Sequence, residues 1–427
     1  MKPYVYKTSD YGQTWTALPA QESGVRGFAH VIKEDTADRN VLFLGTEFGL
    51  WISVDGGQRW AQYRGSDFPD VAVDDIAVHA RESDLVLATH GRGIWIIDDI
   101  SPLRSLTPDL MAKEAALIPG RPVVQYFLAR GGWSEGNETF SGRPRPAGAQ
   151  ITYYQKNRHI FGDLKIEIFN QEGKLIDTVP GSTHRGLNRV TWFMRLKAPE
   201  VAPAATALNG AQRGPRVLPG IYTVKLTKGN QTYTEQINVV GDPRATYTLG
   251  DRKTQFDLSM KIYNLLEHMT WGVDAIEGVR NAANARATKL SEKDPLRKQL
   301  QNLADACDAL RSKIVATKEG GMITGEERIR ELIGELYGNV TSYEGQPTDY
   351  QAARTDSLGH ELQDVIDDFQ RLTQKDLPGI NNSLKKKKME TIVALSEADW
   401  RKTKIESGDA AGGALAQESD DTLEERD

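Results

Sequence analysis

The chain has 427 residues, of which 39% are apolar and 26% are charged, and its formal net charge is −6. This composition is typical of soluble globular domains, and the length suffices for about three of them. The acidic balance argues against nucleic acid as a partner, the single cysteine excludes an intrachain disulfide, and the lack of any run of about 18 apolar residues predicts no membrane span.

The amino-terminal segment contains a repeat. Thr8–Trp15 (TSDYGQTW) returns as Ser53–Trp60 (SVDGGQRW), with a period of 45 residues from Asp10 to Asp55 and from Trp15 to Trp60. A repeat of this length is typical of one blade of a β-propeller. Strand-like runs occur four to a period, at Val25–Ile32, Asn40–Gly45, Leu50–Ser53 and Trp60–Tyr63, then at Asp75–His79, Leu85–Thr89 and Ile94–Ile97. The sequence therefore predicts the last blades of a propeller at residues 1–103, with the other blades missing.

Each copy of the repeated box has an Asp, a Gly and a Trp at matching positions: Asp10, Gly12 and Trp15, then Asp55, Gly57 and Trp60. A carboxylate in a tight turn can accept backbone N–H bonds, a glycine permits positive φ, and a tryptophan packs against the blade. We therefore interpret these residues as structural Asp-boxes. Removing either aspartate should loosen a blade without abolishing one specific reaction.

Two further regions follow the propeller segment. Residues 104–148 are rich in Pro and Gly and are expected to be a connector. Residues 149–243 contain six strand-like runs with hairpin turns at Gln171–Gly173 and Lys228–Asn230, which favours an immunoglobulin-like β-sandwich. The insert Ala198–Pro219 is expected to be a long loop.

From Asp251 the hydrophobic period changes from two residues to about 3.6, which predicts a helical bundle at residues 251–404. After the first helix, further helices are expected at Leu296–Thr317, Glu326–Tyr343, Ser357–Gln374 and Ile380–Lys404, separated by Pro295, Pro347 and Pro378. Thr324–Glu327 resembles a capping box. Cys307 lies in an apolar helical series and is expected to be a core thiol. The acidic tail at residues 405–427 should be disordered. The predicted fold class is multidomain, all-β followed by all-α.

The two boxes, together with Leu87–Asp99 (LATHGRGIWIIDD), resemble the Asp-box (BNR) propellers of sialidases and of the luminal domain of sortilin. The likeness is greatest to the bacterial group labelled sortilin-like or BNR-repeat glycosyl hydrolase. Leu218–Val224 (LPGIYTV) resembles the closing hairpin of its FlgD-type immunoglobulin-like domain, and Gln255–Met260 (QFDLSM) resembles the start of its helical region. The resemblance implies a carboxy-terminal fragment of an exported, extracytoplasmic protein.

Candidate ligand-binding residues lie in the turns opposite the boxes. If a blade runs inner strand first, with the box between its third and fourth strands, the turn between its second and third strands lies on the other face. Glu47 and then His90 with Arg92 occupy that turn in successive blades. The resemblance implies that this face bears the ligand site, so we expect His90 and Arg92 to contact an anionic or sugar ligand beside Glu47. Alternatively, Arg92 pairs with Asp74 or Asp75 and His90 closes a turn.

Three functions remain open. The first is a non-catalytic binding or assembly protein whose propeller binds a peptide, protein or carbohydrate ligand. The second is a glycoside hydrolase completed by the missing blades, because sialidase chemistry gathers its arginines and its tyrosine from many blades. The third is a fragment without function, whose exposed propeller edge is prone to aggregation. No metal site is predicted, because His159, His184, His268 and His360 form no ligand pair, and no cofactor is expected.

Overall fold

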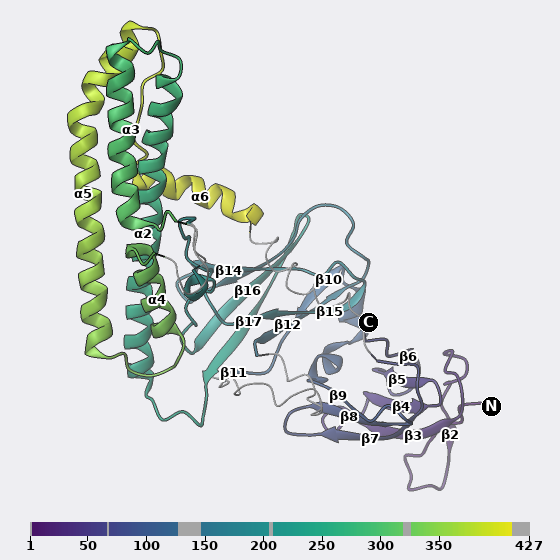
Figure 1. Ribbon diagram of the computed structural model, residues 1–427. Coiled ribbons are helices and arrows are strands. Elements are labelled where there is room, and N and C mark those ends of the chain that lie inside the picture. Colours follow the sequence, from purple (N-terminus) through teal and green to yellow (C-terminus); the bar gives the residue numbers. More distant parts are fainter. Residues whose placement is uncertain (1, 66–67, 127–146, 205–207, 319–325, 412–427) are drawn as a thin grey trace.

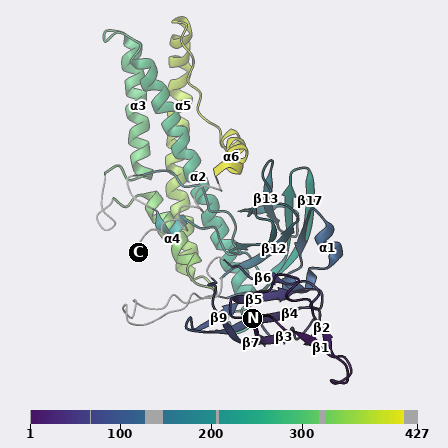
Figure 2. The same ribbon diagram turned by 90° about the vertical axis from the view of Figure 1, so that its right-hand side faces the viewer.

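The computed structural model describes residues 2–65, 68–126, 147–204, 208–318 and 326–411, and it shows a β-rich amino-terminal part followed by a helical carboxy-terminal part (Figure 1). This is the order expected from the sequence. The long helices lie side by side in an elongated bundle, seen from a second side in Figure 2. Thr324–Gly325 of the expected capping box, residues 127–146 of the expected connector and the tail residues 412–427 lie outside the described residues.

Three antiparallel sheets form the amino-terminal part. The first pairs β1 (Tyr6–Lys7) with β2 (Thr16–Ala17). The second is a meander of β3 (Ala29–Glu34), β4 (Leu42–Thr46), β5 (Gly49–Ser53) and β6 (Ala61–Gln62). The third is a meander of β7 (Val73–His79), β8 (Asp84–Thr89) and β9 (Ile94–Ile97). Their Val-, Ile-, Leu- and Trp-rich sequences suit a pleated surface that is buried on one or both faces.

The second and third sheets pack against each other. Phe43 and Leu50 of the second sheet share one core with Ile76, Leu85 and Leu87 of the third. Gly45 lets the strands approach closely, because a Cβ atom there would lie 2.5 Å from the carbonyl oxygen of Val73. A glycine is therefore needed at this position of β4.

The opposite face of the third sheet is exposed in the part of the chain that the structure describes. Ile94 and Ile96 point away from the shared core and are 74% and 60% exposed. Ala88 and Val86 of β8 stand beside them in the register of the sheet. An apolar sheet face of this kind is unusual on a soluble surface and indicates an interaction site.

The central part of the chain consists of two sheets that pack face to face. One has the order β10-β12-β15 and the other the order β11-β17-β16-β13-β14. The strands are β10 (Ala115–Ile118), β11 (Val123–Gln125), β12 (Ala149–Gln155), β13 (Leu164–Phe169), β14 (Leu175–Pro180), β15 (Gly186–Trp192), β16 (Gly220–Lys228) and β17 (Gln231–Gly241). Tyr153, Ile166, Ile168, Trp192 and Leu226 are fully buried between the two sheets.

The expectation that residues 104–148 form a connector is wrong for the described part of that range. After η1 (Ser101–Ser105) and α1 (Pro108–Ala112), β10 pairs antiparallel with β12 and β11 pairs parallel with β17. The apolar run Ala115–Ile118 is buried along its whole length, and this burial determines the structure more strongly than the prolines on either side of it.

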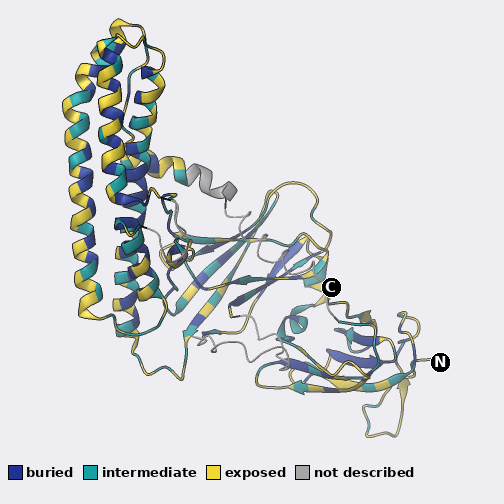
Figure 3. Cartoon of the chain, viewed as in Figure 1, coloured by how far each residue is buried: buried dark blue, intermediate teal, exposed yellow. Residues whose placement is uncertain are grey.

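Five helices of the described chain form the carboxy-terminal part: α2 (Leu249–Ala287), α3 (Pro295–Ile314), α4 (Ile329–Thr341), α5 (Asp349–Lys386) and α6 (Glu397–Ala411). Thr248 with Asp251 and Thr348 with Gln351 form capping boxes that begin α2 and α5. Buried residues follow one side of α3 and α5, whereas residues 269–273 of α2 are buried on all sides of the helix (Figure 3). Cys307 is buried in the shared core, as expected, and burial raises the pKa of its thiol to about 11.

The structure corrects three helix boundaries. Pro378 lies inside α5 rather than ending a helix, because the apolar residues Leu377, Ile380 and Leu384 stay buried on both sides of the missing hydrogen bond. The helix expected at Ile380–Lys404 stops at Lys386, and α6 begins only at Glu397. Residues 405–411, expected in the disordered tail, continue α6.

The described residues of the insert at 198–219, which are 198–204 and 208–219, contact the bundle. The Arg330 guanidinium donates to the carbonyl oxygen of Ala202 (2.6 Å), and the Tyr337 hydroxyl donates to that of Arg213 (2.8 Å). Gly210 lies against Gly334 of α4, where a Cβ atom on Gly210 would come within 2.5 Å of the Gly334 carbonyl oxygen. The expected loop therefore connects the central sheets to the helices.

Asp177 of β14 leads to a pH-dependent prediction. Burial raises the pKa of its carboxyl group from 3.8 to about 6. The folded chain therefore holds a proton between about pH 4 and 6 that the unfolded chain releases, and stability falls as the pH rises through this window. We expect Asp177→Asn to increase the free energy of unfolding by about 1–3 kcal/mol at pH 7.5 and to leave it nearly unchanged at pH 4.

Urea titration at both pH values measures this difference. Glu172→Gln, at an exposed turn of the same sheet, is the control, and an equal gain at both pH values would contradict the prediction.

Candidate functional site

The first Asp-box closes on itself through short-range hydrogen bonds. The Thr8 hydroxyl donates to the Asp10 carboxylate (2.8 Å) and accepts from the Gly12 N–H (2.8 Å). Thr14 donates to Asp10 from its backbone N–H (2.9 Å) and from its hydroxyl (2.6 Å). The hydrogen bonds that Asp10 accepts lower the pKa of its carboxyl group to about 2, and the bond from the Thr14 hydroxyl has the largest effect. The Trp15 indole N–H donates to the Gly12 carbonyl oxygen (3.1 Å).

The second box repeats this network. The Ser53 hydroxyl donates to Asp55 (2.9 Å) and accepts from the Gly57 N–H (2.9 Å), while the Arg59 N–H donates to Asp55 (2.9 Å) and the Trp60 indole donates to the Gly57 carbonyl oxygen (3.1 Å). Gly57 has φ +89°, which favours glycine. Burial opposes ionisation of Asp55, but its hydrogen bonds outweigh that effect and lower its pKa. The carboxylate of each box thus accepts hydrogen bonds from residues of its own turn.

The two tryptophans differ in burial. Trp60 is 6% exposed and packs with Leu18 and Leu42 between the first and second sheets. Trp15 is 61% exposed, since no other sheet of the described chain covers it. The local network is therefore the same in both copies, whereas the packing depends on a neighbouring sheet.

The turn that contains Glu47 lies at the end of the sheet opposite the box. Thr46 pairs with Gly49 at one end of β4 and β5, and Leu42 pairs with Ser53, which begins the box, at the other. In the third sheet, the turn between β8 and β9 contains His90 and Arg92, and Val73 at the start of β7 pairs with Thr89 beside it. Each of the two sheets thus has its candidate residues in the turn between its second and third strands.

A cluster of polar side chains connects the two sheets at this end. The Asp74 carboxylate, at the start of β7, lies 3.9 Å from Nδ1 of His30 in β3 and 3.8 Å from Nδ1 of His90. The ring of Phe28 lies 4.6 Å from that of His30, measured between centroids. His90 is the most exposed member of this cluster. Sequence analysis did not identify His30 or Phe28, and the signal that could have found them is their position at the start of β3.

Arg92 does not have the partner that the alternative interpretation assigned to it. His90, rather than Arg92, faces Asp74. Arg92 lies between Gly91 and Gly93, which both have positive φ, and its side chain is exposed and makes no hydrogen bond or ion pair to another described residue. Its carbonyl oxygen accepts from the Trp95 indole (3.1 Å). Within the described chain, the turn thus presents an exposed guanidinium without a partner.

Glu47 is half-buried beside Gly27, where a Cβ atom would lie 3.1 Å from a Glu47 carboxylate oxygen. The neighbouring Phe48 ring is partly exposed, and the Arg26 guanidinium lies 5.6 Å from its centroid. Within the part of the chain that the structure describes, no hydrogen bond or ion pair connects Glu47 to His90 or Arg92. The structure therefore brings His30, Asp74 and His90 together and leaves Glu47 and Arg92 as separate groups.

Two kinds of feature are absent among the described residues. No group of three or more His, Cys, Asp or Glu side chains is placed to hold a metal ion. No helix is both long enough and apolar enough to cross a membrane.

Comparisons with known proteins do not assign this chain to a family. No protein-family model matches the chain, and no curated protein matches its sequence. Among solved structures, the chain is similar to PorZ, described as an essential bacterial surface component of the type-IX secretion system of human oral-microbiomic Porphyromonas gingivalis. The sequence identity is 15%, the match covers 50% of this chain and 22% of PorZ, and the TM-score is 0.17. At that TM-score the likeness supports no conclusion about this chain.

Proposed function

We propose that the three amino-terminal sheets are blades of an Asp-box β-propeller of the sortilin-like, BNR-repeat group, and that residues 149–243 form its immunoglobulin-like, FlgD-type domain. The repeated box network, with the same five hydrogen-bonded positions in each copy, supports the propeller. The order of a meander segment, a two-sheet domain and a helical bundle supports the group. As in the group that the chain resembles, we propose an extracytoplasmic location for the whole protein.

The uncovered face of the third sheet supports the proposal that further blades exist. The second sheet covers one face of the third through Phe43 and Leu50. Ile94 and Ile96 on the other face stand where the next blade of a propeller packs. The remaining blades are therefore the partner proposed for this face.

We further propose that the end of the sheets opposite the boxes binds a peptide or a carbohydrate without catalysis. The observation that carries this proposal is the Asp74 cluster, which holds His30 and His90 at the end of the sheets where the β8–β9 turn also contains the exposed Arg92. An exposed arginine and histidine can donate hydrogen bonds to a carboxylate or to sugar hydroxyls, and Phe48 adds an aromatic surface. The glycoside hydrolase alternative uses the same end of the sheets and requires acidic and tyrosine side chains from other blades.

Arrays of peptides and glycans test the binding site. We expect the full chain to bind at least one member, and His90→Ala with Arg92→Ala to weaken that binding about tenfold to a hundredfold, because each donor makes a charge-assisted hydrogen bond. Arg39→Ala is the matched control, since Arg39 is an exposed arginine in the β3–β4 turn at the box end. Unchanged binding by the double variant would contradict the proposed site.

A panel of chromogenic glycosides separates binding from hydrolysis. We expect no turnover by the chain. Turnover that is lost in Glu47→Gln, with the fold retained, would favour the hydrolase alternative and contradict the non-catalytic proposal.

A further inference from the structure

The loop between β12 and β13 exposes two large apolar side chains. Ile160 is 70% exposed and Phe161 is 88% exposed. Both lie in the segment Lys156–Asp163, at the end of the central sheets where β16 turns into β17. Since β17 runs toward the start of α2, this turn lies at the other end of the strand (Figure 1). Two adjacent apolar side chains this exposed are costly in water and indicate a partner.

Hydrogen bonds to neighbouring loops hold this segment in place. The His159 N–H donates to the carbonyl oxygen of Thr183 (3.0 Å), and the Gly229 N–H donates to that of Asp163 (2.8 Å). The His159 ring is hydrogen bonded to the Gly162 carbonyl oxygen (2.8 Å). The loops at Thr183 and Gly229 therefore flank the apolar pair in a fixed arrangement.

Four cationic side chains belong to this segment and to the chain on either side of the neighbouring turns. Arg158 and Arg185 are exposed, and neither side chain forms a hydrogen bond or ion pair with the rest of the described chain. Lys156 and Lys228 lie beside α1 and the start of β10, where their ammonium groups donate to the carbonyl oxygens of Ala112 (3.3 Å) and Glu114 (3.4 Å). The segment Lys156–Asp163 itself contains two of these cations and one carboxylate, that of Asp163, although the whole chain carries a net charge of −6. The local charge is thus opposite to the overall charge.

We infer that this apolar tip, Ile160 and Phe161 with Lys156, Arg158, Arg185 and Lys228, docks on an anionic lipid surface. The two apolar side chains enter the boundary between headgroups and acyl chains, and the surrounding cations contact the phosphates. The apolar groups stand on an exposed loop rather than in a groove, and a bilayer accepts such a tip without a matching pocket. Each cation adds attraction to an anionic leaflet, and salt weakens it.

Vesicle flotation tests the inference with the full chain. We expect binding to vesicles of phosphatidylcholine and phosphatidylglycerol in a 3:1 ratio, weaker binding to phosphatidylcholine alone, and loss of binding as salt rises. Ile160→Ser with Phe161→Ser should weaken binding at least about tenfold, because the apolar area no longer leaves water. Arg158→Glu with Arg185→Glu should weaken binding to the anionic vesicles only.

Two controls are available in the helical part of the chain. Val393→Ser removes an apolar side chain that is also exposed, and Lys385→Glu with Lys386→Glu removes charge from the longest lysine run. We expect both to bind as the parent chain does. If the lysine variant loses binding while the tip variants keep it, or if the parent chain binds no anionic vesicle, the inference is wrong.

A label reports directly on insertion. Cys307 is buried and is the single cysteine, so Phe161→Cys provides one accessible thiol for an environment-sensitive dye. The emission of the dye should shift to shorter wavelength when anionic vesicles are added, and it should not change when buffer alone is added. A different result would overturn the lipid assignment. If the chain binds polyglutamate beads but no vesicles, and if Ile160→Ser with Phe161→Ser leaves the bead binding unchanged, the cations bind an acidic protein instead.

Discussion

Glu344→Gln is expected to lower the free energy of unfolding by about 3–5 kcal/mol. Glu344 lies at the junction of the central sheets with the helices, and its side chain is 2% exposed. Its carboxylate is 2.8 Å from the Arg216 guanidinium and 3.8 Å from that of Arg252, and it accepts a hydrogen bond from the Tyr247 hydroxyl. The amide would remove the carboxylate that pairs with Arg216 and lies beside Arg252, which is the costly way to break a buried ion pair.

The charges around Glu344 explain why its loss has so large an effect. Burial lowers the pKa of Arg216, the Glu344 carboxylate opposes this shift, and Arg252 adds repulsion. Burial and repulsion from Arg216 also lower the pKa of the nearby Arg195, to about 10. The junction therefore holds more positive than negative charge even in the parent chain, and Glu344 acts more strongly than Asp242 in favouring the charged form of Arg216.

Urea unfolding followed by circular dichroism measures the effect of Glu344→Gln. Glu335→Gln is the matched control, because Glu335 is an exposed glutamate on α4. Adding Arg216→Met to the Glu344→Gln variant should restore part of the loss, since it removes one uncompensated charge. A loss below about 1 kcal/mol in Glu344→Gln would show that the junction is well solvated and would contradict this account.

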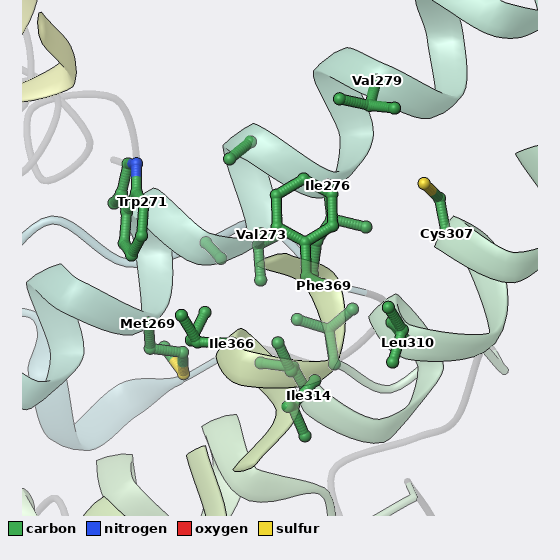
Figure 4. Packing of buried hydrophobic residues seen from close by; sticks show 14 of the residues in the cluster. Met269, Trp271, Val273, Ile276, Val279, Cys307, Leu310, Ile314, Ile366 and Phe369 are labelled. Atoms are coloured by element: carbon green, nitrogen blue, oxygen red, sulfur yellow. The ribbon is translucent and has the colours of Figure 1, made fainter. Parts of the chain in front are cut away.

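Phe369→Ala is expected to lower the free energy of unfolding by about 3–5 kcal/mol. Phe369 of α5 is 3% exposed and points into the core of the bundle among Ile276 of α2 and Leu310 and Ile314 of α3 (Figure 4). Three helices meet around the ring, and Gly272 brings α2 and α5 so close that a Cβ atom there would lie 2.4 Å from Ile366. Such tightly packed helices cannot collapse to fill the cavity that the alanine leaves.

The same urea titration measures the loss in Phe369→Ala. Phe369→Leu should cost less than half as much, because it leaves a smaller cavity. Val393→Ala, at an exposed position in the segment that follows α5, should change the free energy of unfolding by less than about 0.5 kcal/mol. Equal losses in the leucine and alanine variants would show that the ring is not closely packed.

Much of the fold could be predicted because its signals are local. The change of hydrophobic period near Asp251 separated the β-rich part from the helices, and the structure confirms that order. The strand runs of the amino-terminal part lie within a few residues of β3–β9. The apolar series around Cys307 correctly predicted a buried face of α3.

The prediction failed where pairing at a distance determines the structure. The segments β10 and β11 were assigned to a connector because prolines surround them, yet β12 and β17 pair with them from far along the chain. Pro378 was expected to end a helix, yet apolar residues on both sides of it pack into the bundle and keep α5 continuous. In both cases the burial of apolar surface outweighs a local signal.

For the candidate site, the positions of the residues could be predicted from the sequence, but their contacts could not. The positions of Glu47, His90 and Arg92 in the turns opposite the boxes follow from counting strands within a meander. The contacts of Asp74 with His30 and His90 do not, because they depend on how the third sheet packs against the second. The choice between Arg92 and His90 as the partner of Asp74 also required this packing.

The sequence by itself determined the form of each box, because each of its hydrogen bonds spans four residues or fewer. The hydrogen bonds that close the turn are therefore made among the eight residues of the box itself. Only the tertiary structure decided that Trp60 is buried while Trp15 is exposed, that Asp74 gathers two histidines, and that Glu344 lies between two arginines. Burial and charge pairing are properties of two surfaces together, and their free energy cannot be assigned to either segment alone.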